Sequence, residues 1–277
     1  GTLLVLFLAR VLQGIAGASY AAAQAYVADI TTAKDRAKGM GMIGAAFGLG
    51  FILGPAIGAL FSGIDARLPF FVAAALAAAN LAIAYRRLPE SLRPDSRRAP
   101  VPRFALLRRA MSSGDLAPLV WLSFVATFAF IGMESTFALF GERRFDYDMV
   151  QMGLLFVYIG VMAALSQGYL VGRVVERWGE TRVMIGGLAG TAAGLLVVAL
   201  SHDLWLLLLG LAALAIASGF VFATTTALIS LAAGDGEQGA ILGLNAAISG
   251  AGRIAGPVAA ALLFQHAGIE VPLLGGA

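Results

Sequence analysis

The sequence contains no cysteine and only two histidines, His202 and His266, which stand beside the ends of predicted helices. A disulfide framework and thiolate chemistry are therefore excluded, and a metal cluster is not expected. The phosphate-binding pattern G-x-x-x-x-G-K-[ST] is absent, which argues against an ATP-driven pump. A serine, histidine and acid set is not recognisable either. We therefore expect a protein without cofactor or metal that is not an enzyme.

Charged residues are scarce, because they make up 13% of the 277 residues while 60% are hydrophobic. An average soluble domain carries roughly 25% charged residues. A core of this chain length cannot bury so many apolar side chains, so the surrounding solvent must be lipid. The 35 glycines follow no collagen period and suit membrane helices that pack through small residues. The composition therefore predicts an all-α membrane protein.

Eight stretches of the sequence are long and apolar enough to cross a bilayer, which requires about 20 residues. They cover residues 3–28, 40–62, 69–85, 117–140, 150–172, 183–200, 204–232 and 239–265. Most connections between them are short and contain turn-forming residues. Successive helices should therefore be antiparallel neighbours.

Most of the 19 lysines and arginines fall in three connections that lie on the same side of the predicted bundle. They are Lys34, Arg36 and Lys38; Arg86, Arg87, Arg93, Arg97, Arg98, Arg103, Arg108 and Arg109; and Arg173, Arg177 and Arg182. By the positive-inside rule this side, with the long central loop, is cytoplasmic in a multi-pass protein of the cell (inner) membrane. The net charge of +3 therefore reflects topology, and no nucleic acid partner is expected.

Two segments of the chain repeat each other. Residues 41–60 read GMIGAAFGLGFILGPAIGAL, and residues 243–262 read GLNAAISGAGRIAGPVAAAL. The matching positions of the first segment are Gly41, Gly48, Gly50, Gly54, Pro55 and Leu60. Two similar halves are typical of secondary transporters. Counterparts of the spans at 117–200 would lie upstream of residue 1, so we expect a fragment of a protein with six helices per half.

The long connection separates these halves. Residues 89–116 contain Pro94, Pro100 and Pro102 and many arginines, as a linker between bundles would. We assign residues 1–88 to the C-terminal half of a first six-helix bundle and residues 117–277 to a second bundle that lacks most of its last helix. Residues 103–111 form either a solvated basic linker, which we favour, or a short helix on anionic headgroups.

Three motifs resemble those of the major facilitator superfamily, of which the chain would cover the fourth to eleventh of twelve helices. The run from Arg10 through Gln13 to Gly17 is similar to the fourth-helix pattern R-x-x-Q-G-x-x-G, and the resemblance implies a buried arginine linked to proton transfer. A glycine pattern in the second stretch is similar to the helix motif of drug:proton antiporters. Its residues are Gly44, Gly48, Gly50, Gly54, Pro55 and Gly58.

The third motif resembles the family's G-x-x-x-D-R-x-G loop, which implies a role in gating. It consists of Gly172, Glu176, Arg177 and Gly179, with Glu176 in place of the aspartate. Residues 25–37 closely resemble the tetracycline-exporter branch. Thr191 stands where that branch carries an acidic residue, which argues against tetracycline as the substrate.

Charged side chains inside spans are candidates for function, because each costs at least ~2.5 kcal/mol on insertion scales. They are Arg10, Glu134 and Arg253, and Glu134 is the acidic residue well inside the spans. Glu134 has three interpretations: a static ion pair or hydrogen bond, a substrate contact, or the proton carrier. We place the polar residues Gln13, Gln167 and Asn245 beside these charges on the transport pathway.

Asp29 and Arg36 lie at the predicted cytoplasmic edge of the membrane, on either side of a short turn. This spacing predicts an ion pair that latches the helices, with a modest strength of about 1 kcal/mol.

The residues together favour a proton-coupled efflux transporter for small amphiphilic molecules or drugs, which works by alternating access between two six-helix bundles. Its expected partners are a small-molecule substrate, protons and the lipid bilayer, and we expect a monomer. One alternative is a proton-linked importer of sugars or other metabolites. Alternatives of other classes are a membrane-embedded lipid or glycan enzyme and a channel.

Overall fold

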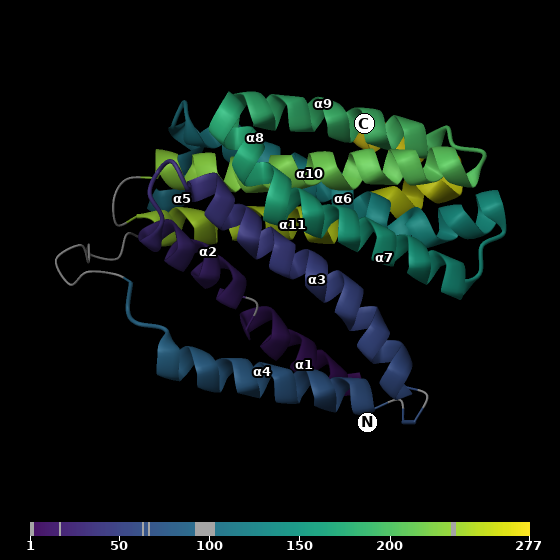
Figure 1. The fold of residues 1–277 in the computed structure, drawn as a ribbon, viewed down its shortest axis with the longest axis horizontal. Coiled ribbons are helices and arrows are strands. Elements are labelled where there is room, and N and C mark those ends of the chain that lie inside the picture. The colour runs from purple at the N-terminus through teal and green to yellow at the C-terminus, as the bar shows by residue number, and fades with distance from the viewer. Residues whose placement is uncertain (1–2, 17, 63, 66, 92–102, 234–236) are drawn as a thin grey trace.

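The computed structural model describes the chain except residues 1–2, 17, 63, 66, 92–102 and 234–236, and all regular elements in the described part are helices (Figure 1). The first half contains α1 (Leu3–Ala16), α2 (Ala18–Ile30), α3 (Arg36–Ser62) and α4 (Leu68–Arg87). The remaining helices are α5 (Arg103–Ser112), α6 (Leu116–Phe145), α7 (Met149–Leu165), the π-helix η2 (Ser166–Leu170), α8 (Val171–Trp178), α9 (Glu180–Ala199), α10 (Leu204–Ala232), α11 (Gln238–His266) and α12 (Val271–Gly276).

Eight helical segments among the described residues are long and apolar enough to cross a membrane. They are Leu3–Ile30, Arg36–Gly54, Leu68–Arg87, Leu116–Phe145, Val150–Trp178, Glu180–Ala199, Leu204–Ala232 and Gln238–His266. Each overlaps one of the eight predicted stretches. The predicted fold class, an all-α multi-pass membrane protein, is therefore confirmed.

The second half packs through glycines. Helix α9 lies against α10, and α11 lies against α6. A Cβ atom at Gly256 would lie 2.6 Å from the carbonyl oxygen of Phe128, and one at Gly194 would lie 2.7 Å from the backbone nitrogen of Leu214. Small residues at these points let the helix backbones approach closely, as is usual in membranes.

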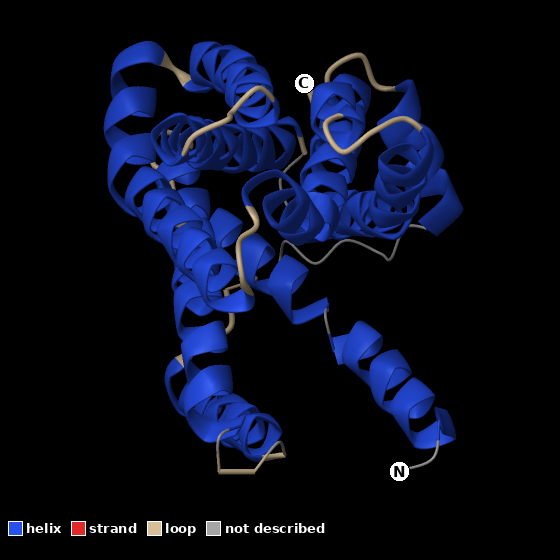
Figure 2. Cartoon of the chain, turned by 90° about the vertical axis from the view of Figure 1, so that its right-hand side faces the viewer, coloured by secondary structure: helices blue, strands red, loops and turns tan. Residues whose placement is uncertain are grey.

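The two halves meet at one end of the molecule. Helix α2 lies against α11, and α3 lies against α7, η2, α8 and α10. Figure 1 shows this contact at the end where α2 runs into α3, whereas α1 and α4 diverge from the second half toward the other end. In Figure 2 the N-terminal helix stands apart from the second half. We call the end that carries residues 31–35 the basic end, and the opposite one the far end.

The segment at 103–111 is a helix rather than the solvated linker that we favoured. Leu106 and Ala110 of α5 are buried in the same apolar cluster as Leu116 and Val120 of α6. Helix α5 also contacts α11. The prediction was wrong because two apolar side chains at i and i+4 share one helix face and can bury together.

Arg144 ties three elements together at the far end. Its guanidinium donates hydrogen bonds to the carbonyl oxygens of Ala199 and Ser201, at 3.1 and 3.2 Å. It also forms an ion pair of 2.7 Å with Glu270, just before α12. The cation therefore caps the C-terminal end of α9, where free carbonyl groups and the helix dipole favour positive charge.

Candidate functional site

The contact between the halves is built on the predicted glycines of α3. A Cβ atom at Gly41 would lie 2.6 Å from the carbonyl oxygen of Gln167, and one at Gly48 would lie 3.2 Å from the backbone nitrogen of Ala164. A Cβ atom at Gly44 would overlap the side chain of Gln167. The backbone of α3 therefore lies directly against that of η2 at Gly41 and that of α7 at Gly48, and a larger residue at Gly41 would force the helices apart.

The other members of the glycine motif do not take part in this contact. Gly50 and Gly54 have nothing within 4 Å of an added Cβ atom among the described residues. Their repeat counterparts Gly252 and Gly256, in contrast, pack against the α6 backbone near Phe128. The side-chain surroundings of Pro55 and of the Gly58 position lie outside the described residues.

The π-helix η2 places Gln167 between the halves. Ser166, the first residue of η2, donates a hydrogen bond of 2.8 Å to the carbonyl oxygen of Ile216 on α10. Gln167 itself packs against Gly44 of α3 and lies near Gly219 of α10. Its side-chain oxygen is buried and has no hydrogen-bond partner among the described residues. Single π-helical turns inside α-helices are frequent at functional sites.

An aromatic cluster lies where the two halves approach each other. The ring of Tyr20 on α2 lies 6.5 Å from the ring of Phe47 on α3 and 6.4 Å from that of Phe222 on α10. Tyr20 also forms a side-chain hydrogen bond with Gln24. Tyr20 was not among the predicted site residues, although its spacing of four residues from Gln24 puts both on one helix face.

Arg253 connects this cluster to Glu134. The guanidinium on α11 is within Coulombic range of Tyr20 on α2 and of Glu134 on α6. Glu134 is partly buried and Arg253 is exposed. No salt bridge of 4.0 Å or less joins the two among the described residues. Helix α11, which carries Arg253, therefore contacts both the helix of Glu134 and the helix of Tyr20.

The structure describes the remaining predicted pathway residues less completely. The side chain of Arg10 lies outside the described residues, and Gln13 lies exposed on α1. Asn245 on α11 is 8% exposed, and its side-chain oxygen has no hydrogen-bond partner in the described part of the chain. Thr191 on α9 likewise has a buried hydroxyl without such a partner.

Arg36 joins the halves at the basic end. It is 6% exposed and donates hydrogen bonds to the hydroxyl of Ser230 on α10 and, at 3.0 Å, to the carbonyl oxygen of Thr31. Asp29 accepts a hydrogen bond of 2.8 Å from Ser91 instead. The predicted ion pair between Asp29 and Arg36 is therefore wrong, since each side chain has a partner that is distant in sequence.

The predicted gating loop also lies against the first half. Glu176 of α8 forms an exposed ion pair of 3.4 Å with Lys34, and Gly172 packs against the side chain of Lys38. Gly179 ends α8 with a φ of 78°, a conformation that favours glycine. Arg177 is exposed.

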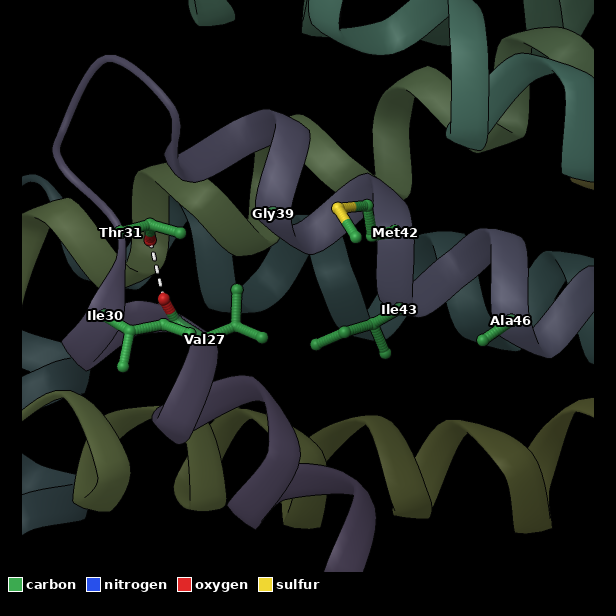
Figure 3. Close-up of a pocket in the computed structure, with 7 residues that line it drawn as sticks. All are labelled: Val27, Ile30, Thr31, Gly39, Met42, Ile43 and Ala46. Carbon is green, nitrogen blue, oxygen red and sulfur yellow. Dashed lines mark hydrogen bonds between the residues drawn. The ribbon is translucent and has the colours of Figure 1, made fainter. Parts of the chain in front are cut away.

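An apolar groove of about 330 Å³ runs between the end of α2 and the start of α3 (Figure 3). It is lined by Val27, Ile30, Thr31, Gly39, Met42, Ile43 and Ala46. Its one hydroxyl, on Thr31, donates to the carbonyl oxygen of Val27 at 2.6 Å, as the dashed line in Figure 3 shows. The groove thus offers apolar contact but no charge, and we assign it no chemical role.

Comparison with known proteins gives consistent results. The sequence model of the Major Facilitator Superfamily matches residues 1–174 and 162–277. The chain is 31% identical over 257 residues to the Tetracycline resistance protein, class C, of Escherichia coli, which corresponds to 92% of this chain and 65% of that protein. It is 30% identical over 271 residues to Multidrug resistance protein 1 of Bacillus subtilis, or 95% of this chain and 68% of that protein.

The fold is also similar to a solved structure. The crystal structure of the human organic anion transporter MFSD10 (TETRAN) matches with a TM-score of 0.87 and 29% sequence identity. The match covers 99% of this chain and 68% of the other. The chain thus spans about two thirds of the length of the relatives that it matches.

Proposed function

The chain belongs to the Major Facilitator Superfamily, and on this basis we propose that it forms part of a proton-coupled exporter of small amphiphilic molecules. Relatives that are named for tetracycline and multidrug resistance support efflux. The resemblance in fold to an organic anion transporter supports transport of small molecules rather than catalysis.

The position of Arg253 carries the proposal. It lies exposed on α11, which packs against α6, the helix of Glu134, and against α2, the helix of Tyr20 in the first half. An ionised Glu134 partly compensates the guanidinium charge, and a protonated Glu134 does not. Proton binding therefore changes the electrostatic field at the aromatic cluster, where a substrate would contact both halves. Charged groups placed inside spans commonly serve such relays.

The aromatic cluster supports an amphiphilic substrate. The rings of Tyr20, Phe47 and Phe222 offer apolar faces, while Gln24 and Arg253 offer polar groups. Apolar rings with a few polar groups beside them suit contact with drug-like molecules. Sugar import would instead call for many hydrogen-bonding groups, so efflux is the better explanation.

The contact at the basic end is, in this proposal, the closed cytoplasmic gate. The positive charge of this end supports a cytoplasmic position in a protein of the cell (inner) membrane. Alternating access then requires α3 to separate from α7 and η2, which breaks the glycine contact and the hydrogen bond between Arg36 and Ser230. Gating roles for Asp29, Gly172, Glu176, Arg177 and Gly179 belong to the same proposal, as does action as a monomer.

The test uses the full-length protein in proteoliposomes, with ethidium as an amphiphilic probe. The Glu134→Gln variant keeps the side-chain shape but deletes the titration. It should retain exchange of ethidium without a gradient and lose uphill export that is driven by a pH gradient. The matched control is Glu142→Gln, an exposed glutamate on the same helix, which should transport as the wild type does.

Each outcome separates the three interpretations of Glu134. Loss of coupling with exchange intact supports a proton carrier. Loss of ethidium binding indicates a substrate contact, and full retention of pH-driven export indicates a static role and contradicts proton carriage. A wild-type protein that moves neither ethidium nor any other amphiphile down a gradient would contradict the proposed export altogether.

A further inference from the structure

Helix α8 presents two different surfaces at the basic end. Gly172 and Glu176 contact Lys38 and Lys34 of the first half. Val171 and Val175 are buried. With 100° per residue, Arg173 and Arg177 point away from both sets and are exposed. One side of α8 therefore contacts the first half of the chain, and another side is exposed on the surface of the protein.

The exposed surface has an ordered arrangement of cation and ring. The guanidinium of Arg173 lies 3.7 Å from the centre of the Tyr169 ring, and it donates a hydrogen bond of 3.2 Å to the carbonyl oxygen of Tyr169. Tyr169 is 58% exposed. Trp178, which is 59% exposed, ends α8 on another side of the helix. Stacking on a ring fixes the plane of an arginine and leaves its other N–H groups available.

This surface lies at the end of a membrane-crossing segment, Val150–Trp178. Tyrosine and tryptophan at such ends lie at the level of the lipid headgroups. Arginine binds phosphate oxygens well because its donors are planar and remain charged. The nearest acidic side chain on the helix, Glu176, is engaged with Lys34, so it leaves the charge of the arginines available for an anion.

We propose that Tyr169, Arg173 and Arg177 form a binding surface for the phosphate of an anionic phospholipid, and that the bound lipid favours the closed gate. A lipid is the occupant because the charged groups stand beside an exposed ring at the end of an apolar span, and a soluble phosphate would make no use of that ring. The bound lipid restrains α8, and an adjacent side of α8 contacts Lys34 and Lys38 of the gate. The proposal rests on the proposed function only in identifying this contact as a gate.

The binding test uses the full-length protein in bilayers of phosphatidylcholine with or without phosphatidylglycerol. The chain contains three tryptophans, so the fluorescence of Trp178 is obtained by subtracting the fluorescence of the Trp178→Phe variant from that of the wild type. Brominated phosphatidylglycerol should quench it more than brominated phosphatidylcholine at equal mole fraction. In Arg173→Gln/Arg177→Gln the apparent affinity for phosphatidylglycerol should fall about fivefold for each arginine. The control is Arg86→Gln/Arg87→Gln, which removes the same charge from the end of α4 and should keep the preference.

The effect of the lipid on the gate is tested with the double variant Lys34→Cys/Glu176→Cys. Its disulfide should form several-fold faster in bilayers that contain phosphatidylglycerol than in pure phosphatidylcholine.

Equal quenching by both lipids, or a preference that survives loss of both arginines, overturns the lipid surface. Displacement of the lipid by millimolar inorganic phosphate assigns the surface to a soluble anion and also overturns it. A cross-linking rate that does not depend on lipid overturns the link to the gate. None of these measurements depends on transport, so their failure leaves the proposed export untouched.

Discussion

At the scale of single residues, Arg36 shows how a buried cation can join two halves of a membrane protein. It belongs to the first turn of α3, yet its hydrogen bond reaches Ser230 near the end of α10. Ser230 is fully buried. Removing one acceptor from a buried charged donor costs more than removing a surface hydrogen bond, because the donor cannot be solvated in the closed state.

We therefore expect Ser230→Ala to weaken the contact at the basic end by about 1–3 kcal/mol, a shift of about 5- to 150-fold toward separated halves. Spin labels at the exposed positions Ala33 and Thr181 report the separation by pulsed electron paramagnetic resonance. Ser218→Ala is the control, since that hydroxyl on α10 donates to Ala215 within its own helix. Unchanged distances in Ser230→Ala would show that the hydrogen bond does not hold the halves together.

Glycine positions in α11 differ sharply in the space around them. A Cβ atom at Gly256 would lie 2.6 Å from a backbone oxygen of α6, whereas Gly243 has open space around it in the described part of the chain. Gly256→Ala should therefore lower stability by about 1–3 kcal/mol through overpacking. Gly243→Ala should be neutral or slightly stabilising, because alanine favours helix. Thermal unfolding of the full-length protein in detergent compares the two, and equal melting temperatures would contradict the close packing.

Single residues could be selected from the sequence as candidates, but a partner that comes from elsewhere in the chain could not be predicted. Charge inside an apolar span was enough to single out Glu134 and Arg253. Short spacing suggested that Asp29 and Arg36 pair, but tertiary folding brings Ser91 to the first and Ser230 to the second. No local pattern contains that information.

At the scale of elements, α5 is the helix that departs most from the sequence-based prediction. Its arginines suggested a solvated linker, yet Leu106 is 7% exposed and Ala110 is fully buried. Composition averages over the segment and so conceals the two apolar positions that share a face. The long spans were predictable to within a few residues, because twenty consecutive apolar residues leave little choice of structure in a bilayer.

Leu106→Ala should release α5 from α6 and α11, since loss of a buried leucine side chain costs about 2–5 kcal/mol. Cleavage by trypsin after the exposed Arg108 should then become faster in the folded protein. Leu88→Ala is the control, because that leucine near the end of α4 is 58% exposed and its loss should leave the cleavage rate unchanged. Equal rates for both variants would mean that α5 is not held by Leu106.

At the scale of the whole molecule, the two halves share a repeated sequence, but the repeated glycines have different neighbours in each half. The repeat predicted two related bundles, and its glycines occur on both α3 and α11. On α11, Gly252 and Gly256 meet α6 within one half, while on α3 Gly41 and Gly48 meet the other half. Sequence similarity alone does not reveal which surface of a helix faces which neighbour, so this difference required the structure.

The contact between halves predicts a specific rescue. Gly44→Ala should hold the halves apart at the basic end, because its Cβ atom would overlap the side chain of Gln167. Shortening that side chain in Gly44→Ala/Gln167→Ala should restore the contact, a non-additive result expected of residues that touch. The spin-label distance between positions 33 and 181 measures both variants. Additive effects would contradict direct packing of the two residues.

The three bonds of Arg144 impose an order on the synthesis of the second half. Its hydrogen-bond acceptors follow it by 55 and 57 residues, and Glu270 comes later still. A nascent chain therefore carries this cation at the end of α6 without its partners until α9 has been inserted, and without its carboxylate until residue 270 has left the ribosome. The far end of the second half is thus completed last, and chains that terminate before residue 270 leave the membrane machinery with an arginine whose ion pair never forms.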